Sequence, residues 1–196
     1  MKLSTTPIAG LHTIHLDRID DERGHLHRLF DAVEWRGMTG RTWQWDQVVT
    51  SFTQDKNTLR GMHYQLPPNA EGKLVIPLAG RMFWASVDVR PASPSFGHWH
   101  GIPLSPDSNT ALLAQPGFAH GCLSLSTSVS LLILSTQTHR AAQGAGFRWD
   151  DPTVGIRWPD LGAPPLLSRA HKDLTSFSTF AATLGDWARE KEVVHA

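Results

Sequence analysis

The chain has 196 residues, the length of one ordinary domain or of one domain with an added helix. Its 18 basic and 18 acidic side chains cancel, which argues against a general nucleic-acid binder and against a polybasic membrane binder. Apolar residues make up 40% of the chain and can form a real core, so a disordered chain is also excluded. Eleven histidines stand beside a single tyrosine, which raises the question of a titratable site or a metal site.

The number of cysteines and the lengths of the apolar stretches indicate the cellular compartment. Cys122 is the only cysteine, so no intrachain disulfide can form and nothing indicates an oxidising compartment. The first ten residues lack the apolar run of a signal peptide, and no stretch approaches the ~18 apolar residues of a membrane helix. We therefore expect a cytoplasmic protein without membrane contact.

Most of the chain consists of short apolar runs separated by glycine and proline. In chain order, runs of about four to eight residues predict strands at 74–78, 82–89, 110–115, 121–126 and 128–136. The Ala79-Gly80 pair between the first two runs predicts a hairpin. In the second run Phe83, Ala85 and Val87 recur with period two, which predicts one face in an apolar layer. The pattern indicates a mainly β protein, a sandwich or a jelly roll.

The C-terminal part has a different period. Apolar residues recur there at helical spacing, at Leu174, Phe177, Phe180, Ala181, Leu184, Trp187 and Ala188. This predicts one amphipathic helix with Asp173 as a candidate N-cap, and we expect residues 190–196 to fray. We accordingly divide the chain into a β domain over residues 1–165 and a helical segment over 166–196 that packs on the same domain.

Two His-x-His pairs, His25 with His27 and His98 with His100, are the first candidates for a metal site. Residues two apart share a strand face, but a metal site in a β barrel also needs a carboxylate and a further histidine. Neither pair has a glutamate a few residues on, so we interpret both as surface or loop histidines.

A second group of candidates contains Arg60, His63 and Lys73. An arginine, a histidine and a lysine within fourteen residues could hold an anion and move a proton. The strand must bend at Gly61 if Arg60 and His63 are to reach one pocket. His120 follows a Pro-Gly turn at the start of a strand, so it is either a pocket residue at a barrel mouth or a turn histidine bonded to backbone.

Seven segments occur in order along the chain: DERG (21–24), RGMHYQ (60–65), GKLV (72–75), VDVR (87–90), SPSFG (93–97), PGFAHG (116–121) and RWDDPTVGIRWP (148–159). Together they resemble the dTDP-4-dehydrorhamnose 3,5-epimerase family, over roughly residues 11–173. The resemblance implies a cupin-type jelly roll with a C-terminal α-helix. It also implies that no metal and no other cofactor is used, and that the protein is a homodimer.

The resemblance further implies proton transfer beside the ketone of a nucleotide-linked 4-keto-6-deoxyhexose. His63 would be the base, and Lys73 would stabilise the enolate oxygen. Arg60 and His120 would line the same pocket, and Arg23 would reach the nucleotide.

The residue that would orient His63 has two candidates. The family places an aspartate before the final helix, and an ungapped alignment puts His171 at that position. A small gap puts Asp173 there instead, and Asp173 is our prediction.

Five positions depart from the family pattern. The proton-donor tyrosine falls at Ile133, a base-stacking tyrosine at His139, two glutamates at Gly144 and Arg28, and a Gln-x-Asn segment at Val48-Val49-Thr50. The acid that returns the proton is therefore missing, and water, His139 or Thr136 would have to replace it. The pocket would still gather four cations, which favours an anionic ligand: Arg23, Arg28, Arg60 and Lys73.

Three functions are compatible with these residues. The first is an isomerase of deoxysugar or secondary-metabolite biosynthesis that uses His63 to epimerise one or two carbons. The second is a diverged tailoring enzyme that enolises, cyclises or isomerises a non-nucleotide small molecule, and the third is a non-catalytic binding cupin. We predict the first, with an anionic or nucleotide-linked sugar as ligand and with neither nucleic acid nor membrane as partner.

Overall fold

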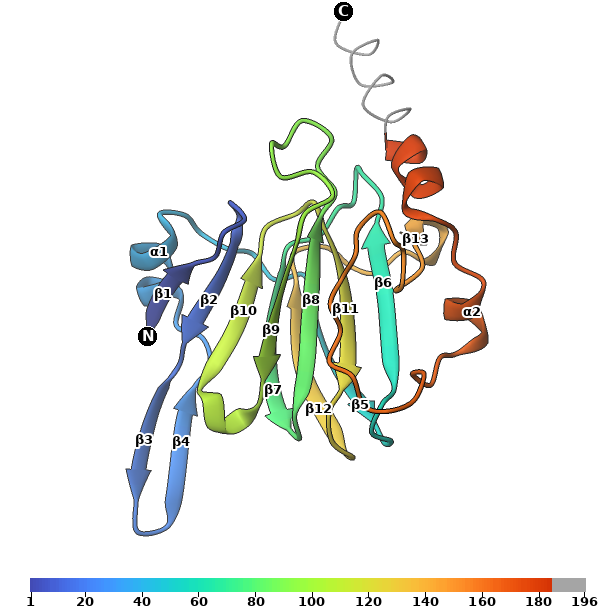
Figure 1. The fold of residues 1–196 in the computed structure, drawn as a ribbon. Helices are drawn as coiled ribbons and strands as arrows, with labels where there is room; N and C mark the ends of the chain where they lie inside the picture. Colours follow the sequence, from blue (N-terminus) through green and yellow to red (C-terminus); the bar gives the residue numbers. More distant parts are fainter. Residues whose placement is uncertain (185–196) are drawn as a thin grey trace, which may run out of the picture.

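The structure is a computed structural model that describes residues 1–184 (Figure 1). Its elements are β1 (Lys2–Thr5), β2 (Leu11–His15), β3 (Asp17–Asp21), β4 (Gly24–Arg28), α1 (Ala32–Thr39), β5 (Gln47–Thr53), β6 (Leu59–Gln65), β7 (Lys73–Ala79), β8 (Met82–Asp88), β9 (Trp99–Leu104), η1 (Pro106–Ser108), β10 (Thr110–Ala114), β11 (Phe118–Ser124), β12 (Val129–Ser135), η2 (Ala141–Gln143), β13 (Gly144–Gly146) and α2 (Arg169–Lys172). None of the helices in the described part of the chain has the length and apolar character needed to cross a membrane.

Two antiparallel sheets form the body of the molecule. One has the order β1-β2-β10-β7-β12-β5 and the other the order β13-β6-β11-β8-β9, while β3 and β4 pair only with each other. An apolar core cluster combines residues from both sheets, such as Val75 of β7, Trp84 of β8 and Leu131 of β12. The mainly β prediction is confirmed.

The turn at Ala79-Gly80 does not make the predicted hairpin. β7 pairs with β10 and β12, whereas β8 pairs with β11 and β9, so the turn crosses from one sheet to the other. Gly80 has a φ of +71°, and a Cβ there would lie 2.9 Å from Oγ of Ser126. The turn needs glycine because the chain reverses tightly between the sheets.

Strand β8 is buried on both faces, although its period-two pattern predicted a single apolar layer. Met82 and Trp84 lie in the core between the sheets, while Val87 lies in a second cluster with Phe147 and Phe180. The C-terminal part of the chain therefore covers the outer face of the five-stranded sheet, a long-range contact that periodicity does not report.

Residues 177–184 are helical, as the apolar spacing predicted, and Phe177, Phe180 and Leu184 are buried. The N-cap is Ser176 and not Asp173: the Thr179 amide donates to Oγ of Ser176 at 3.2 Å. Asp173 instead follows α2 as its C-cap residue. Trp187, Ala188 and the 190–196 segment lie outside the described residues.

Candidate active site

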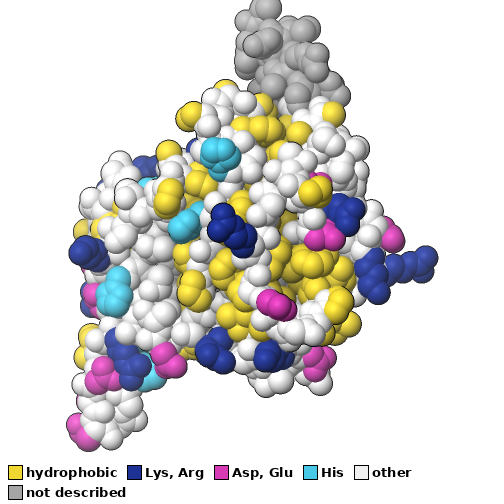
Figure 2. Space-filling view, viewed as in Figure 1, with side chains coloured by type: hydrophobic (Ala, Val, Ile, Leu, Met, Phe, Trp, Pro, Cys, Tyr) yellow, Lys and Arg dark blue, Asp and Glu magenta, His cyan; other side chains and the backbone are white. Residues whose placement is uncertain are grey.

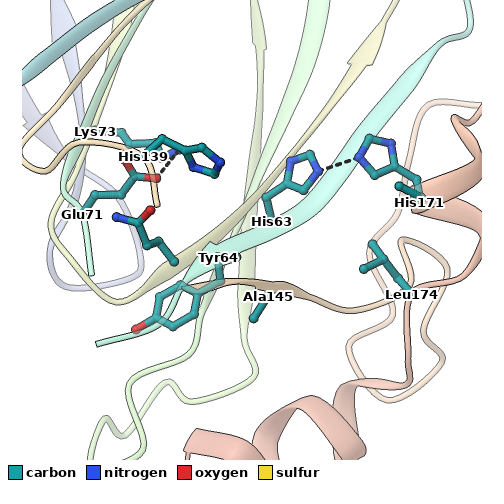
Figure 3. Close-up of a pocket in the computed structure, with 11 residues that line it drawn as sticks. His63, Tyr64, Glu71, Lys73, His139, Ala145, His171 and Leu174 are labelled. Carbon is teal, nitrogen blue, oxygen red and sulfur yellow. Dashed lines mark hydrogen bonds and ion pairs between the residues drawn. The ribbon is translucent and has the colours of Figure 1, made fainter. Parts of the chain in front are cut away.

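A cavity of about 360 Å³ opens between β6, the start of β7, β13 and α2 (Figure 3). Its lining residues are His63, Tyr64, Gln65, Glu71, Lys73, His139, Gly144, Ala145, Ala170, His171 and Leu174. Ligand sites commonly combine a mostly apolar cavity with a few convergent polar groups. This one brings two predicted catalytic residues, His63 and Lys73, to the same space.

A second hollow of about 320 Å³ lies beside the loop between β13 and α2. Trp149, Trp158 and several prolines line it, and Asp160 is its one titratable lining residue. Figure 2 shows charged side chains of both signs scattered over the face that it draws, with no concentration of lysine and arginine. The first cavity is therefore the better candidate for proton-transfer chemistry.

Strand β6 bends at Gly61, as the sequence required. His63 pairs with His120 and Arg60 with Cys122, so the register shifts by one residue between the two pairs. This bulge turns Arg60 and His63 toward the same side. Arg60 nevertheless does not line the cavity, because its side chain donates to Oγ1 of Thr53 at 3.0 Å and to the backbone oxygen of Phe52 at 3.1 Å.

The His63 ring lies against His171. The two Nε2 atoms are 2.6 Å apart, and the ring centroids are 4.5 Å apart. His171 is carried by α2, a helix of four residues whose N-cap Ser168 accepts from the His171 amide. His171, and not the predicted Asp173, is therefore the residue that contacts His63. Helix α2 turns His171 toward β6 and ends just before Asp173. This agrees with the ungapped alignment.

The environment of His63 disfavours its charged form. The side chain is accessible from the cavity, yet the surrounding protein desolvates the ring and lowers its pKa to about 4. The positive charges of His171, Lys73, Arg60 and His139 act in the same direction. At neutral pH His63 is thus an uncharged imidazole, able to accept a proton.

Across the cavity, Nζ of Lys73 forms an ion pair with Oε1 of Glu71 at 2.8 Å (Figure 3). Both side chains are largely buried. Between them, the Gly72 amide donates to Oγ1 of Thr136 at 2.8 Å, which fixes the start of β7. Glu71 was not predicted as a site residue, although its position two residues before Lys73 places both on one side of an extended chain.

His120 is buried beside this wall without lining the cavity. Its Nδ1 accepts from the Trp84 indole at 3.3 Å and lies 3.0 Å from Oγ of Ser86. Because an indole N–H only donates, the imidazole proton resides on Nε2, which is buried and has no partner within the described residues. Burial, and then the charges of Lys73 and His63, hold the pKa of His120 well below its usual range.

No tyrosine occupies the place of the family's proton donor. Ile133 packs against the core cluster between the sheets and does not line the cavity. Tyr64 packs edge-on against Phe180, its pKa is raised to about 12 by burial, and its hydroxyl points away from His63 in Figure 3. Of the candidate replacements, His139 lines the cavity, whereas Thr136 does not.

The hairpin of β3 and β4 projects from the body of the molecule and carries Arg23 and Arg28 away from the cavity (Figure 1). Arg23 is 82% exposed and pairs with Asp21 at 2.6 Å, and Arg28 lies 3.8 Å from Glu34. Of the four cations predicted to gather in the pocket, only Lys73 lines it within this chain. The hairpin carries two of the others away, and Arg60 is bonded to β5.

The two His-x-His pairs lie outside the cavity. His25 and His27 stand on the projecting hairpin, where Nε2 of His27 contacts Oδ1 of Asn109 at 2.9 Å. Within residues 1–184, no three His, Cys, Asp or Glu side chains are grouped so that they could hold a metal ion.

Comparison with protein families gives a match over residues 5–179 to the model of dTDP-4-dehydrorhamnose 3,5-epimerase. The enzyme of that name from Salmonella typhimurium is 34% identical over 155 residues, which cover 76% of this chain and 81% of the relative. A dTDP-4-dehydro-6-deoxyglucose 3-epimerase from Streptomyces bikiniensis is 31% identical, covering 81% of this chain and 80% of the relative.

Solved structures agree with this assignment. The dTDP-6-deoxy-D-glucose-3,5-epimerase of Legionella pneumophila, in complex with dTDP-4-keto-L-rhamnose, superposes with a TM-score of 0.88 at 32% identity, covering 93% of this chain and 96% of that one. A 3'-monoepimerase from Streptomyces bikiniensis, in complex with dTDP-quinovose, gives 0.84 at 28% identity, covering 96% of both chains. The chain thus belongs to the dTDP-4-dehydrorhamnose 3,5-epimerase family, as an epimerase-type isomerase with a cupin-type jelly roll.

Proposed function

We propose that the protein epimerises a carbon next to the ketone of a nucleotide-linked 4-keto-6-deoxysugar, with His63 as the base. The observation that carries this proposal is the placement of an uncharged imidazole and a lysine on opposite walls of one cavity. Relatives named as acting on dTDP-4-keto sugars support the choice of substrate.

The two walls supply different parts of the reaction. The ketone acidifies the protons on the flanking carbons, and His63 removes one of them. The negative charge then moves to the ketone oxygen, where the ammonium group of Lys73 stabilises the enolate. Glu71 holds Lys73 in place through their ion pair.

We further propose that a single carbon is epimerised. Ile133 has no proton to give and lies in the core, so the wall opposite His63 lacks the family's tyrosine. The groups that could return a proton from that wall are His139 and water that enters the cavity. A single inversion demands less of such a replacement than two inversions do.

A homodimer would explain the projecting hairpin. Its cross-strand partners Ile19 and Leu26 are 55% and 63% exposed, and a two-stranded hairpin is marginal by itself. Val48 and Phe52 on the edge strand β5 are also exposed. In a dimer the hairpin could carry Arg23 to the cavity of the second copy.

We expect the double variant Ile19→Lys with Leu26→Lys to lower the molar mass measured by light scattering to that of one chain. An unchanged mass would contradict the dimer.

A second candidate is a tailoring enzyme for a non-nucleotide small molecule. The observation in its favour is that two positions of the family's nucleotide site are altered, to His139 and Gly144, and that Arg23 is remote within this chain. Calorimetric titration with thymidine diphosphate separates the two. Saturable binding favours the nucleotide sugar, and no binding to the folded protein favours the alternative.

The decisive experiment is hydrogen exchange in heavy water. We expect incubation with dTDP-4-keto-6-deoxyglucose to introduce deuterium at one flanking carbon, detected by NMR. The variant His63→Asn should lose exchange by roughly 100-fold or more, because a general base contributes that much. His98→Asn, at a residue that does not line the cavity, is the matched control. No exchange at either carbon with correctly folded protein would refute the epimerase proposal.

A further inference from the structure

We infer that His171 is the proton partner of His63, so that the base of this enzyme is a pair of imidazoles in place of a histidine with a carboxylate. This inference rests on the proposed function and specifies how its base works. The Nε2 atoms of the two rings are 2.6 Å apart, so one ring donates and the other accepts. The pair therefore shares one proton between these two nitrogens.

The contact decides which nitrogen of His63 meets the substrate. Nε2 is turned to His171, and within the described residues no hydrogen bond engages Nδ1 of His63. Nδ1 is then the nitrogen available to a ligand in the cavity. To act as a base, Nδ1 must be unprotonated, so the shared proton sits on Nε2 of His63 and points at Nε2 of His171.

Proton transfer along this contact balances without any further group. The substrate C–H bond breaks, its proton binds the lone pair of Nδ1 in His63, and the electron pair passes to the ketone oxygen as an enolate. The Nε2 proton of His63 can then move to the Nε2 lone pair of His171. His63 becomes a neutral imidazole again, and His171 becomes an imidazolium.

The charge of the pair differs from that of a histidine with an aspartate. An aspartate would make the resting pair negative and the proton-loaded pair neutral, whereas two histidines go from neutral to positive. The charged and titratable groups around His63 come from several elements: Arg60 on β6, Lys73 on β7 with its partner Glu71, His120 on β11, His139 before η2, and His171 on α2. Most of these are cationic or become so, which weakens the base and keeps it unprotonated.

The test uses the intact protein and three substitutions. His171→Asp introduces a carboxylate, and His171→Gln replaces the imidazole by an amide that does not titrate. Asp173→Asn tests the gapped alignment. His100→Gln, on β9 and away from the cavity lining, is the matched control. Two readouts are needed: ¹⁵N NMR titration of the imidazoles without substrate, and deuterium incorporation into dTDP-4-keto-6-deoxyglucose as a function of pH.

We expect His171→Asp to raise the titration midpoint of His63 by about one unit or more, since an opposite charge at contact distance has that effect. His171→Gln should slow deuterium incorporation by roughly tenfold or more and shift the pH at which it falls, while thymidine diphosphate binding is retained. The Asp173→Asn and His100→Gln variants should change neither readout. Rescue of the rate by His171→Asp would show a proton partner and not mere packing.

The two proposals fail in different ways. If His171→Gln leaves both readouts unchanged, or Asp173→Asn changes them instead, the imidazole pair is refuted. If the wild-type protein incorporates no deuterium but His171→Asp shifts the titration of His63, the pair stands and the epimerase proposal falls.

Discussion

The two walls of the cavity are built from different parts of the fold. Lys73 begins β7, which is hydrogen-bonded on both sides by β10 and β12 in the middle of the six-stranded sheet. His171 stands on a helix of only four residues outside both sheets. The charge-stabilising wall is thus anchored by one sheet, whereas the proton-moving wall combines His63 on strand β6 of the other sheet with His171 on a short helix. Changes near His171 should affect proton transfer more than stability, and changes along β7 should affect both.

The largest effect is expected from Lys73→Met. Removal of a preorganised charge at the developing enolate should lower the exchange rate by roughly 100-fold, the scale of a lost oxyanion donor. Because Glu71 then loses its partner, the melting temperature should fall as well. The double variant Glu71→Gln with Lys73→Met should recover stability without recovering exchange. Recovery of exchange would mean that Lys73 does not stabilise the enolate.

A smaller effect is expected from Ile133→Tyr, which puts an aromatic ring in place of a smaller aliphatic side chain. Ile133 packs against the core between the sheets, so overpacking should cost about 1–3 kcal/mol in the free energy of unfolding. Denaturant titration measures this cost, with Ile133→Leu as the volume-matched control. New deuterium at the second flanking carbon would indicate that the added hydroxyl reaches the substrate. An unchanged unfolding free energy would contradict the packing described here.

The smallest effect concerns the dependence of stability on pH. The pKa of His63 is about 4 in the folded protein against 6.5 for a free imidazole, so the unfolded chain binds more protons between these values. Stability contributed by His63 is therefore present above about pH 6.5 and lost as pH falls toward 4. We expect His63→Gln to reduce the fall in melting temperature between pH 7 and pH 5. The exposed hairpin variant His25→Gln should not, and equal behaviour of the two variants would contradict the assignment.

The five runs predicted as strands correspond to β7, β8, β10, β11 and β12, because their apolar residues are buried in the two sheets. Sequence patterns did not predict that Ala79-Gly80 joins two sheets, since a turn sequence specifies a reversal and not the partners of its flanking strands. The burial of both faces of β8 was also missed, because the covering residues, such as Phe147 and Phe180, are distant in sequence.

The candidate site was predicted only in part, because some of its contacts also join residues that are distant in sequence. His63 and Lys73 were predicted together because their motifs are local, and the structure places both at one cavity. The bend at Gly61 was predicted on the condition that Arg60 and His63 reach one pocket. Whether His171 or Asp173 contacts His63 depended on a gap of two residues in the alignment. Only the position of α2 decides between the two. Within this chain Arg23 and Arg28 lie away from the cavity. The direction in which a hairpin projects is not encoded in its own residues.

The bend in β6 limits how this sequence can vary. Gly61 has a φ of +134°, and a Cβ there would lie 2.6 Å from Cα of Gly121 and 2.7 Å from the backbone oxygen of His120. Any side chain at position 61 would push β6 away from β11, and His63 would move with it. Position 61 is thus tied to the base two residues later, because any residue other than glycine there would displace the group that takes the proton.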